Sequence, residues 1–543
     1  MAIVGAFKLT ASNRRVLASA PRHSQVQWVM RAFALGCAAV CVYAMRQADP
    51  DLWGYLAYGR LFVEHGGPVT WDPFAYTSAG SHWVAFEYLA QVLIWEAYHL
   101  GGPLGLIVLK CLVGGSAVYF LFAAIRAASD DSAVWVAVFV LAASILSRYF
   151  LFRPQLFSFA FFALYTVVLI RSLLGDSKAL WVLPVIMLAW VNLHGGFLAG
   201  LGLLCVAVAL RVFQNANTRG WGRQLLVGTR GLWIALFASI VVTFVNPQGL
   251  RLWSYVLTEV FHNTNRLYID EWRPTLQAGD HWTAVTFILL TAVLAIVGWL
   301  GHRHLASLGG LRPWQWVLSC VPLTLMAFQS VRHVPIATIW MAPVIALLAS
   351  GLRARLSGAH LFQVGWPVVA GVACLPAILT CYIVLMQPSP GITVAMGTLG
   401  SKHPCSAVAF MRKNDLRGNL YAPLWWGSYI TWHLYPEVRV SMDGRNISLF
   451  PDRMVVENLK FYSDGASRVD LDAPLRYETR FLLVPSDRLV LQRVLGDSRW
   501  RNIFSDSDSA LFVRADKQQW LTMPPSNNRR PETPAPGCPN FMK

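Results

Sequence analysis

The feature that most constrains the fold of this chain is a series of apolar stretches separated by short polar segments. A helix of about 20 apolar residues crosses the hydrocarbon core of a membrane, and about eleven stretches approach that length, with boundaries uncertain by a few residues. Charged residues make up only 13% of the chain, whereas about 25% is usual for a soluble protein. We therefore predict a polytopic α-helical membrane protein. The expected spans are 27–45, 103–126, 132–148, 155–173, 179–194, 196–212, 231–247, 282–301, 314–331, 334–351 and 362–386.

The positions of the basic residues orient these spans. If the N-terminal segment 1–26 lies in the cytoplasm, every inside segment carries lysine or arginine, and the 211–230 loop carries four. This is the charge distribution that the positive-inside rule describes. The net charge of +17 does not indicate nucleic-acid binding, because the bases lie between the spans and form no single stripe. No cleavage site follows the first apolar run, so we expect the first span to remain uncleaved.

This orientation divides the chain into large regions. A transmembrane domain at 27–386 includes a long first outer loop at 46–102. Residues 387–522 alternate strand-like and helical runs, which predicts a soluble α/β domain on the outer side. The tail at 523–543 is rich in proline and polar residues, and we expect it to be disordered.

Residues 85–100 leave an alternative topology open. They are apolar but contain Glu87 and other polar residues, so we interpret them as an interfacial helix that lies on the bilayer. If they crossed the membrane instead, every later segment would change sides. The basic loops would then lie outside.

An acid pair follows the first span at the outer surface. Asp49 and Asp51 flank Pro50, and two carboxylates at this spacing can share a metal ion, or one can be a base that the other orients. A carboxylate at a low-dielectric edge has a raised pKa, which suits general-base catalysis on a hydroxyl. A helix cap with solvated acids is the alternative. Glu87 is either a further active-site acid or the partner of a nearby arginine.

Other polar residues gather at the outer ends of the spans. Arginine and histidine at the outer ends do not help to orient the chain in the membrane, so another reason for their presence is needed. Arginine binds phosphate through several hydrogen-bond donors. A phosphate or pyrophosphate ligand is therefore one explanation, and hydrogen bonds between helices or contacts with headgroups are the other. The candidates are Arg153, Gln155, His194, Glu271, Arg332 and His333.

The soluble domain contains a second group of candidates. Trp425, Trp426 and Tyr429 lie close to a glycine and are suited to stacking on a sugar or a peptide. Asp443 and Arg445 flank a turn. A domain core and a tight turn would explain the same residues. The chain has no pattern of residues spaced like zinc ligands. It also has no glycine-rich phosphate loop, and this absence argues against a nucleotide as the direct substrate.

Taken in order, these motifs resemble the GT-C superfamily, whose members are multispan glycosyltransferases that use polyprenyl-phosphate sugars. The likeness extends over nearly the full length, and the ordered set is specific although no single motif is. The landmarks are Asp49-Pro50-Asp51-Leu52-Trp53, Asp72-Pro73-Phe74-Ala75-Tyr76-Thr77, Arg153-Pro154-Gln155, Asn192-Leu193-His194-Gly195-Gly196, Asn246-Pro247, Glu271-Trp272, Arg332-His333 and Asp443-Gly444-Arg445. Pro50-Asp51 also resembles the Asp-Glu start of protein mannosyltransferases and aminoarabinose transferases. The chain departs from the pattern at Phe86-Glu87-Tyr88, where similar proteins usually have His-Glu-Trp.

The resemblance implies a fold, a reaction and residue roles. It implies a GT-C-like protein of the bacterial inner membrane that transfers a sugar, with inversion, from a polyprenyl-phosphate donor to a glycan, lipid or protein acceptor on the periplasmic face. Asp51 would be the general base, while Asp49 and Glu87 would position the acceptor or a divalent metal ion such as Mg²⁺ or Mn²⁺. The donor's phosphate and sugar would contact Arg153, Gln155, His194, Glu271, Arg332 and His333. The acceptor would contact Trp425, Trp426, Tyr429, Asp443 and Arg445.

Other functions remain open at this point. An oligosaccharyltransferase or polysaccharide ligase would use a pyrophosphate-linked glycan. The run from Trp425 to Tyr429 resembles the Trp-Trp-Asp-Tyr-Gly signature of oligosaccharyltransferases, but it lacks the acid. A lipid or sugar transporter would place charges near the membrane midplane, whereas the polar residues here are expected at the outer rim. A non-catalytic assembly protein would keep its cellular activity after Asp51→Asn.

Overall fold

The computed structural model describes residues 36, 49–219, 228–261, 270–356, 403–445 and 448–516 of the 543-residue chain. Apart from Gly36, the predicted spans at 27–45 and 362–386 lie outside the described residues, as do the segment 1–26 and the tail at 523–543. The total number of spans therefore stays a prediction.

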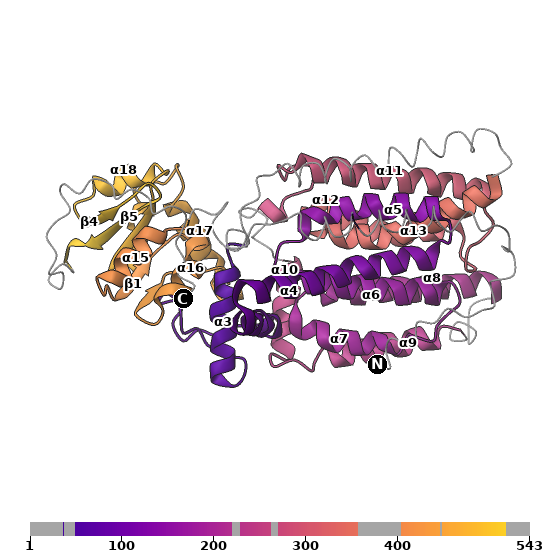
Figure 1. Ribbon diagram of the computed structural model, residues 1–543, viewed down its shortest axis with the longest axis horizontal. Coiled ribbons are helices and arrows are strands. Elements are labelled where there is room, and N and C mark those ends of the chain that lie inside the picture. Colours follow the sequence, from indigo (N-terminus) through magenta and orange to yellow (C-terminus); the bar gives the residue numbers. More distant parts are fainter. Residues whose placement is uncertain are drawn as a thin grey trace.

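The described residues form two parts that lie end to end along the longest axis of the molecule (Figure 1). The helical part extends from Tyr88 to Leu356, and most of its helices run along that axis. The C-terminal part comprises residues 403–516 and contains a β-sheet. Helix α3 (Leu52–His65) lies between the two parts and across the long axis.

Some helices of the helical part begin at recognisable caps. The Asp131 carboxylate accepts hydrogen bonds from the N–H groups of Ala133 and Val134 (3.0 and 3.2 Å) at the start of α5. Pro313 occupies the first position of α12, where a missing N–H costs nothing. The helices are α4 (Tyr88–Ala128), α5 (Ser132–Leu146), α6 (Gln155–Leu173), α7 (Val182–Leu193), α8 (Phe197–Arg219), α9 (Arg230–Val242), α10 (Leu250–Phe261), α11 (His281–His304), α12 (Pro313–Gln329) and α13 (Val334–Leu356).

Six of the described helical segments are long and apolar enough to cross a membrane. They include α4, α6, α8 and α11, together with α5 and α13 extended by adjoining turns. Helices α7 and α9 are apolar but shorter than the spans predicted at 179–194 and 231–247. These findings confirm a mainly helical chain with several helices of membrane-spanning length.

Helix α4 joins the predicted interfacial helix at 85–100 to the predicted span at 103–126. The helix is interrupted at Gly102, which has φ 54° and ψ −142° and is followed by Pro103. Glycine adopts this positive φ without the steric cost that a side chain would add, and proline does not continue a regular helix. The interruption therefore falls where the sequence predicted a boundary.

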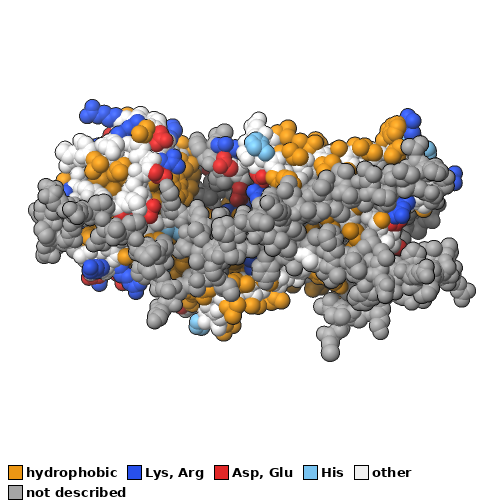
Figure 2. Space-filling view, turned by 45° about the horizontal axis from the view of Figure 1, so that its top comes forward, with side chains coloured by type: hydrophobic (Ala, Val, Ile, Leu, Met, Phe, Trp, Pro, Cys, Tyr) orange, Lys and Arg blue, Asp and Glu red, His pale blue; other side chains and the backbone are white. Residues whose placement is uncertain are grey.

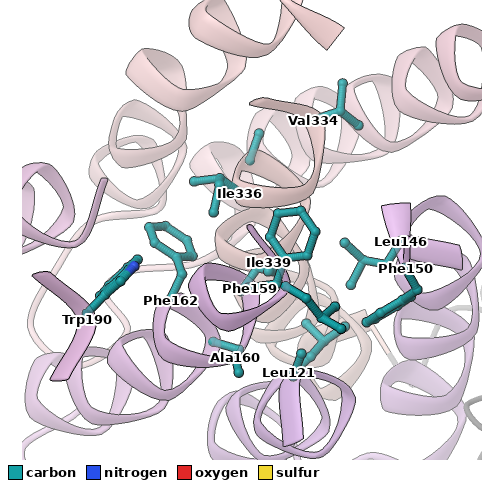
Figure 3. Packing of buried hydrophobic residues seen from close by; sticks show 14 of the residues in the cluster. Leu121, Leu146, Phe150, Phe159, Ala160, Phe162, Trp190, Val334, Ile336 and Ile339 are labelled. Atoms are coloured by element: carbon teal, nitrogen blue, oxygen red, sulfur yellow. The ribbon is translucent and has the colours of Figure 1, made fainter. Parts of the chain in front are cut away.

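The core of the helical part is built around α6 and α13, most of whose residues are buried. Figure 3 shows Phe159 and Phe162 of α6 close to Ile336 and Ile339 of α13. Because lipid is as apolar as these side chains, the helices associate through close packing rather than through the hydrophobic effect. By contrast, α4 exposes large apolar side chains such as Leu104, as expected of a helix that faces lipid.

The helix connections gather at two opposite ends of the helical part. At the end far from the C-terminal part, Arg353 pairs with Asp131 (2.6 Å), and Arg211 donates hydrogen bonds to the carbonyls of Ser172 and Leu173 (2.8 Å each). Figure 2 shows basic side chains at this end, which we call the basic end. The opposite end, beside α3, is called the site end. In Figure 2 acidic and basic side chains also meet there, at the junction of the two parts.

The C-terminal part contains a five-stranded mixed sheet in the order β2-β1-β3-β5-β4. Strand β1 pairs in parallel with β2 and β3, and β5 pairs antiparallel with β3 and β4. The sequence predicts strand-like runs at 420–422, 438–442, 481–485 and 510–514, and all strands except β4 overlap with one of them. The strands are β1 (Gly418–Tyr421), β2 (Val438–Val440), β3 (Phe481–Pro485), β4 (Trp500–Ser505) and β5 (Ser509–Arg514), and the α-helices are α15 (Cys405–Lys413), α16 (Leu424–Leu434), α17 (Asp452–Phe461) and α18 (Val490–Leu495).

The first outer loop is built into this sheet. Ala75 forms a parallel bridge with Val440 of β2, and the N–H of Tyr76 donates to the carbonyl of Val440 (3.0 Å). The hydroxyl of Thr77 donates to the carbonyl of Ser441. The loop that carries the predicted acids and the C-terminal part are therefore packed as one structural unit.

Candidate functional site

Asp49 and Arg153 connect separate segments at the site end. Asp49 is buried, with 1% of its surface exposed. Its Oδ1 accepts the N–H of Asp51 (2.7 Å), and its Oδ2 pairs with Nε of Arg153. Nη1 of Arg153 in turn contacts Oε1 of Glu271. Burial alone would raise the pKa of Glu271, but Arg153 and a second arginine outweigh burial and lower it. This chain of contacts fixes the acid loop against the start of α6.

Asp51 differs from Asp49 in having a free carboxylate. Asp51 is partly exposed, and no described residue donates a hydrogen bond to its side chain. Burial and the negative charges of Glu271 and Asp443 raise the pKa of Asp51 to about 7. A carboxylate with this pKa exchanges protons readily at neutral pH, which is what a general base must do.

Glu87 and His194 form a second group at the site end. Oε1 of Glu87, just before α4, lies 3.5 Å from Nε2 of His194, which lies in the turn between α7 and α8. Burial raises the pKa of Glu87 to about 8, although the charge of Arg332 opposes the rise. Burial and Arg332 lower the pKa of His194 to about 3. At neutral pH Glu87 is therefore mostly protonated and His194 is neutral.

The contacts of His194 determine which of its nitrogens carries the proton. The N–H of Gly196 donates to Nδ1 of His194 (2.9 Å), so Nδ1 is an acceptor and the proton belongs to Nε2. Oγ of Ser158 also lies 2.7 Å from Nδ1, and Nε1 of Trp190 donates to that Oγ (2.7 Å). Ser158 and Trp190 thus hold the ring with its Nε2–H directed toward Glu87.

Arg332 is available to an anionic ligand. It forms no ion pair with another described residue, and its guanidinium lies 4.8 Å over the ring of Trp272. Its neighbour His333 contacts the same ring with its centroid at 6.1 Å. Arg153 is different, since Asp49 and Glu271 already neutralise it.

Tyr55 is a site residue that the sequence analysis did not identify. It lies one helical turn after Asp51 on α3, so the two side chains share a face. Burial and the charges of Asp51 and Glu87 raise its pKa well above the usual value, so the hydroxyl keeps its proton. The spacing of four residues from an acid was the available signal. An aromatic residue near the membrane surface is, however, also typical of an interfacial position.

The C-terminal aromatic candidates lie mostly in the interior. Trp426 and Tyr429 of α16 are buried, and Trp425 has 36% of its surface exposed. Gln155, the remaining donor-side candidate, is the partly exposed first residue of α6, and its amide has no hydrogen bond to a described residue. Of this set, only Trp425 and Gln155 are accessible to a ligand in this conformation.

Asp443 and Arg445 form a buried ionic cluster with Asp72 of the first loop. Nε and Nη2 of Arg445 donate to the two oxygens of Asp443 (2.8 and 2.7 Å), and Nη2 also contacts Oδ1 of Asp72 (2.8 Å). The guanidinium lies 4.8 Å over Trp83 and 5.1 Å over Tyr58. Burial opposes the charged form of Arg445, but Asp443 outweighs it and raises the pKa. These surroundings do not support the direct acceptor contact that the sequence suggested for Asp443 and Arg445.

Asp49 does not fit the metal-ligand role that the acid pair allowed. Both of its oxygens are engaged, one by the N–H of Asp51 and the other by the positive charge of Arg153. Within the described ranges, no three His, Cys, Asp or Glu side chains gather in a way that could hold a metal ion.

Comparisons with known proteins give a clear result for the fold. No protein-family model matches the sequence, and no curated protein sequence matches it significantly. The crystal structure of the Archaeoglobus fulgidus oligosaccharyltransferase tethered with an acceptor peptide is similar, with a TM-score of 0.55 and 11% identity over 90% of this chain and 74% of that chain. Oligosaccharyltransferase AglB of the same organism, in complex with an inhibitory peptide and a dolichol-phosphate, gives a TM-score of 0.58 and 12% identity over 92% and 75%.

A mycobacterial structure extends this likeness to another transferase. Arabinofuranosyltransferase AftD gives a TM-score of 0.50 and 12% identity over 89% of this chain and 41% of that chain. Identities this low show the fold alone. The chain has the fold of the GT-C glycosyltransferases, which confirms the predicted resemblance at the level of the fold.

Proposed function

We propose that this protein is a membrane glycosyltransferase that moves a sugar from a polyprenyl-phosphate donor to an acceptor hydroxyl on the periplasmic face of a bacterial inner membrane. The observation that carries the proposal is the free carboxylate of Asp51, whose pKa is raised to about 7 at the site end of a GT-C fold. A structurally similar protein is described in complex with dolichol-phosphate, which is a polyprenyl phosphate. The acceptor is a glycan, a lipid or a protein.

Asp51 acts as the general base in this reaction. It removes the proton of the acceptor hydroxyl as the hydroxyl oxygen attacks the anomeric carbon of the donor sugar. The bond between that carbon and the phosphate oxygen breaks at the same time, and the polyprenyl phosphate leaves with the bonding electrons. A single displacement of this kind inverts the anomeric configuration. Asp49 positions the base, because its Oδ1 holds the N–H of Asp51 (2.7 Å).

Arg332, Glu87 and His194 stabilise the leaving phosphate. Negative charge grows on the phosphate as the bond breaks, and donors that are already in place contribute most at that moment. Arg332 supplies a charge that no described carboxylate pairs with. His194 supplies a neutral Nε2–H, and protonated Glu87 supplies an O–H. Arg153 and Glu271 contribute by holding this end together.

The orientation of the protein is also part of the proposal. The arginines of the basic end fit the cytoplasmic side, which places the site end and the C-terminal part in the periplasm. The disulfide bond of Cys405 supports this placement, since disulfides persist in oxidising compartments. We assign 27–386 to the transmembrane domain and 387–522 to a periplasmic α/β domain.

A transfer assay with the purified, lipid-reconstituted protein tests the proposal. A panel of radiolabelled polyprenyl-phosphate sugars is offered with a membrane extract as acceptor, and wild type is compared with Asp51→Asn. We expect the substitution to lower transfer by about 100- to 10,000-fold, the range that loss of a general base commonly costs. Asp131→Asn is the matched control, because asparagine also caps a helix and Asp131 lies at the basic end. Transfer that survives Asp51→Asn would exclude Asp51 as the base.

A second function is favoured by one observation. The oligosaccharyltransferase AglB superposes with the higher TM-score, 0.58 against 0.50 for the arabinofuranosyltransferase. An oligosaccharyltransferase or polysaccharide ligase would use a glycan on a polyprenyl pyrophosphate. Including such a donor in the panel separates the two functions, since only the ligase would consume the pyrophosphate-linked glycan and ignore single sugars on a monophosphate.

A further inference from the structure

Gly444 lies where the C-terminal part touches the acid site. A Cβ atom at this position would lie 2.7 Å from Cγ of Asp51 and still closer to Oδ1, an approach that real Cβ atoms essentially never show. The φ angle of Gly444 is not in the left-handed region. A side chain at this position would therefore displace the Asp51 carboxylate, so the close approach, and not the backbone conformation, favours glycine here.

The residues on either side anchor the turn that contains Gly444. Arg445 binds Asp443 through two hydrogen bonds and Asp72 through a third contact, all within 2.8 Å. These three residues are buried. The hydrogen bonds between the guanidinium and the two carboxylates join charged groups, and such bonds are stronger than those between neutral groups. The turn is thereby tied to the first loop, which carries Asp51 as well.

A second anchor comes from α16. The N–H of Gly444 donates to Oγ of Ser428 (3.3 Å), and Ser428 packs directly against α3. That packing is tight, since a Cβ atom on Gly54 would lie 2.9 Å from the same Oγ. Asp51 occupies the N-cap position of α3 without a capping hydrogen bond from its side chain, so the helix and the turn meet the carboxylate from two directions.

We propose that the turn Asp443-Gly444-Arg445 is a positioning element for the Asp51 carboxylate, so that the C-terminal part completes the catalytic site. The inference rests on the proposed role of Asp51 as the base. Gly444 forms a wall against one carboxylate oxygen and limits the rotation of the group, which keeps the other oxygen directed at the acceptor. Asp443 and Arg445 hold Gly444 in place and do not touch a substrate.

Gly444→Ala tests this role with little change in chemistry. A displacement of the base by about 1 Å can lower the rate by about 100-fold, so we expect kcat to fall by that factor while KM for the donor and the melting temperature stay unchanged. Gly465→Ala in the same part is the control, because a Cβ there meets no atom within 4 Å. We expect wild-type kinetics from it. Wild-type kcat in Gly444→Ala, or a raised KM alone, would overturn the proposal.

A readout that does not need turnover separates this proposal from the proposed function. A hydrophobic carbodiimide reacts with protonated carboxyl groups, and mass spectrometry reports its addition to Asp51. We expect Gly444→Ala to change the labelling rate of Asp51 several-fold and Gly465→Ala to leave it unchanged. Equal rates would overturn the positioning role even if the wild type transferred no sugar from any donor, a result that by itself would reject only the proposed function.

Ser428→Ala covers the case in which Gly444→Ala does not fold. It removes the hydrogen-bond acceptor of the Gly444 N–H and adds no volume. We expect kcat to fall about 10-fold at constant KM, the loss that one misplaced contact of about 1.4 kcal/mol produces. A wild-type kcat in this variant would overturn the proposal.

Discussion

The two ends of the helical part use charged residues in opposite ways. At the basic end, Arg211 binds main-chain carbonyls and Arg353 pairs with Asp131, which also caps α5. At the site end, the side chain of Asp51 accepts no hydrogen bond from a described residue, and Arg332 forms no ion pair with one. Charges at the basic end stabilise the helix connections, whereas part of the charge at the site end is left for a ligand.

This difference indicates that the site end, and not the basic end, gives up folding stability for function. A carboxyl group that is buried without a full set of partners resists ionisation and costs stability when it ionises. The site end keeps two such groups, Asp51 and Glu87, with pKa values raised to about 7 and about 8. Strongly perturbed groups that gather in one place are typical of functional sites.

Removing one arginine from each end gives the largest expected difference. Arg153→Gln leaves Asp49 without its counter-charge and leaves Glu271 with only the more distant charge of Arg332, and breaking a buried pair costs about 3 kcal/mol of unfolding free energy. We expect transfer to fall at least about 100-fold, because the acid loop shifts. Arg353→Gln breaks a more exposed pair, which is worth less than about 1 kcal/mol, and transfer should not change. Thermal unfolding in detergent and the transfer assay measure both effects, and equal losses of stability would contradict the comparison.

The pH dependence of transfer gives the next largest effect. Asp51 works as a base only when it is deprotonated, and its pKa is about 7. The rate should therefore fall about tenfold for each pH unit below 7. Arg353→Gln should show the same profile, because the basic end takes no part in the proton transfer. A rate that is constant from pH 5 to pH 8 would reject Asp51 as the titrating base.

Glu87→Gln tests the stability cost of the site end. The pKa of Glu87 rises from 4.5 to about 8 on folding, so the folded state holds more protons than the unfolded state between these values. Stability should therefore fall as pH rises through this window, and Glu87→Gln should remove the part of the fall that Glu87 contributes, while Asp51 keeps its own part. We expect the variant to be as stable as wild type at pH 4, more stable at pH 9, and less active.

Glu64→Gln is the matched control for this prediction. Glu64 lies on α3 in the same loop, with 66% of its side chain exposed and an ion pair to Arg60. Exposed pairs of this kind contribute little, so the variant should follow the wild-type stability profile at every pH. A profile for Glu87→Gln that also follows wild type would show that Glu87 ionises freely.

Two buried serines give the smallest expected difference. Ser158→Ala removes the acceptor of the Trp190 N–H and a contact of His194, which should cost about 1 kcal/mol and lower transfer about 10-fold. Ser144→Ala in α5 removes only a bond to the carbonyl of Leu141 (2.8 Å), so transfer should be unchanged. Nitrogen NMR of His194 adds a direct test, because Ser158→Ala should increase the population of the other tautomer.

Sequence periodicity and charge were enough to place the candidate residues at one end of the molecule. Arg153, His194 and Arg332 stood out because bases at outer span ends do not help the topology, and the structure brings them to the site end. Their individual roles were not predictable in this way. Arg153 is neutralised by Glu271, which is 118 residues away, and no local pattern reveals such a pair.

The C-terminal part shows the same limit in its secondary structure. Strand β3 consists of a fully buried apolar run and is evident from the sequence. Strand β4 was not, because it contains the polar, half-buried residues Arg501 and Asn502 and an irregularity in its pairing with β5. Helix α16 is rich in aromatic residues, which favour strands, so packing against α3 decides its conformation. The cluster of Asp72, Asp443 and Arg445 depends on the same long-range packing.

The docking of the first loop on β2 has a consequence for the time course of biosynthesis. The hydroxyl of Thr77 binds the carbonyl of Ser441, 364 residues further along the chain. At a synthesis rate of 5–20 residues per second, roughly 20–70 s separate the two. During that interval the acids have already entered the membrane surface, but the turn around Gly444 does not yet exist. The protein is therefore expected to be inert while it is being inserted, and to gain its activity only when the end of the chain has folded back onto the beginning.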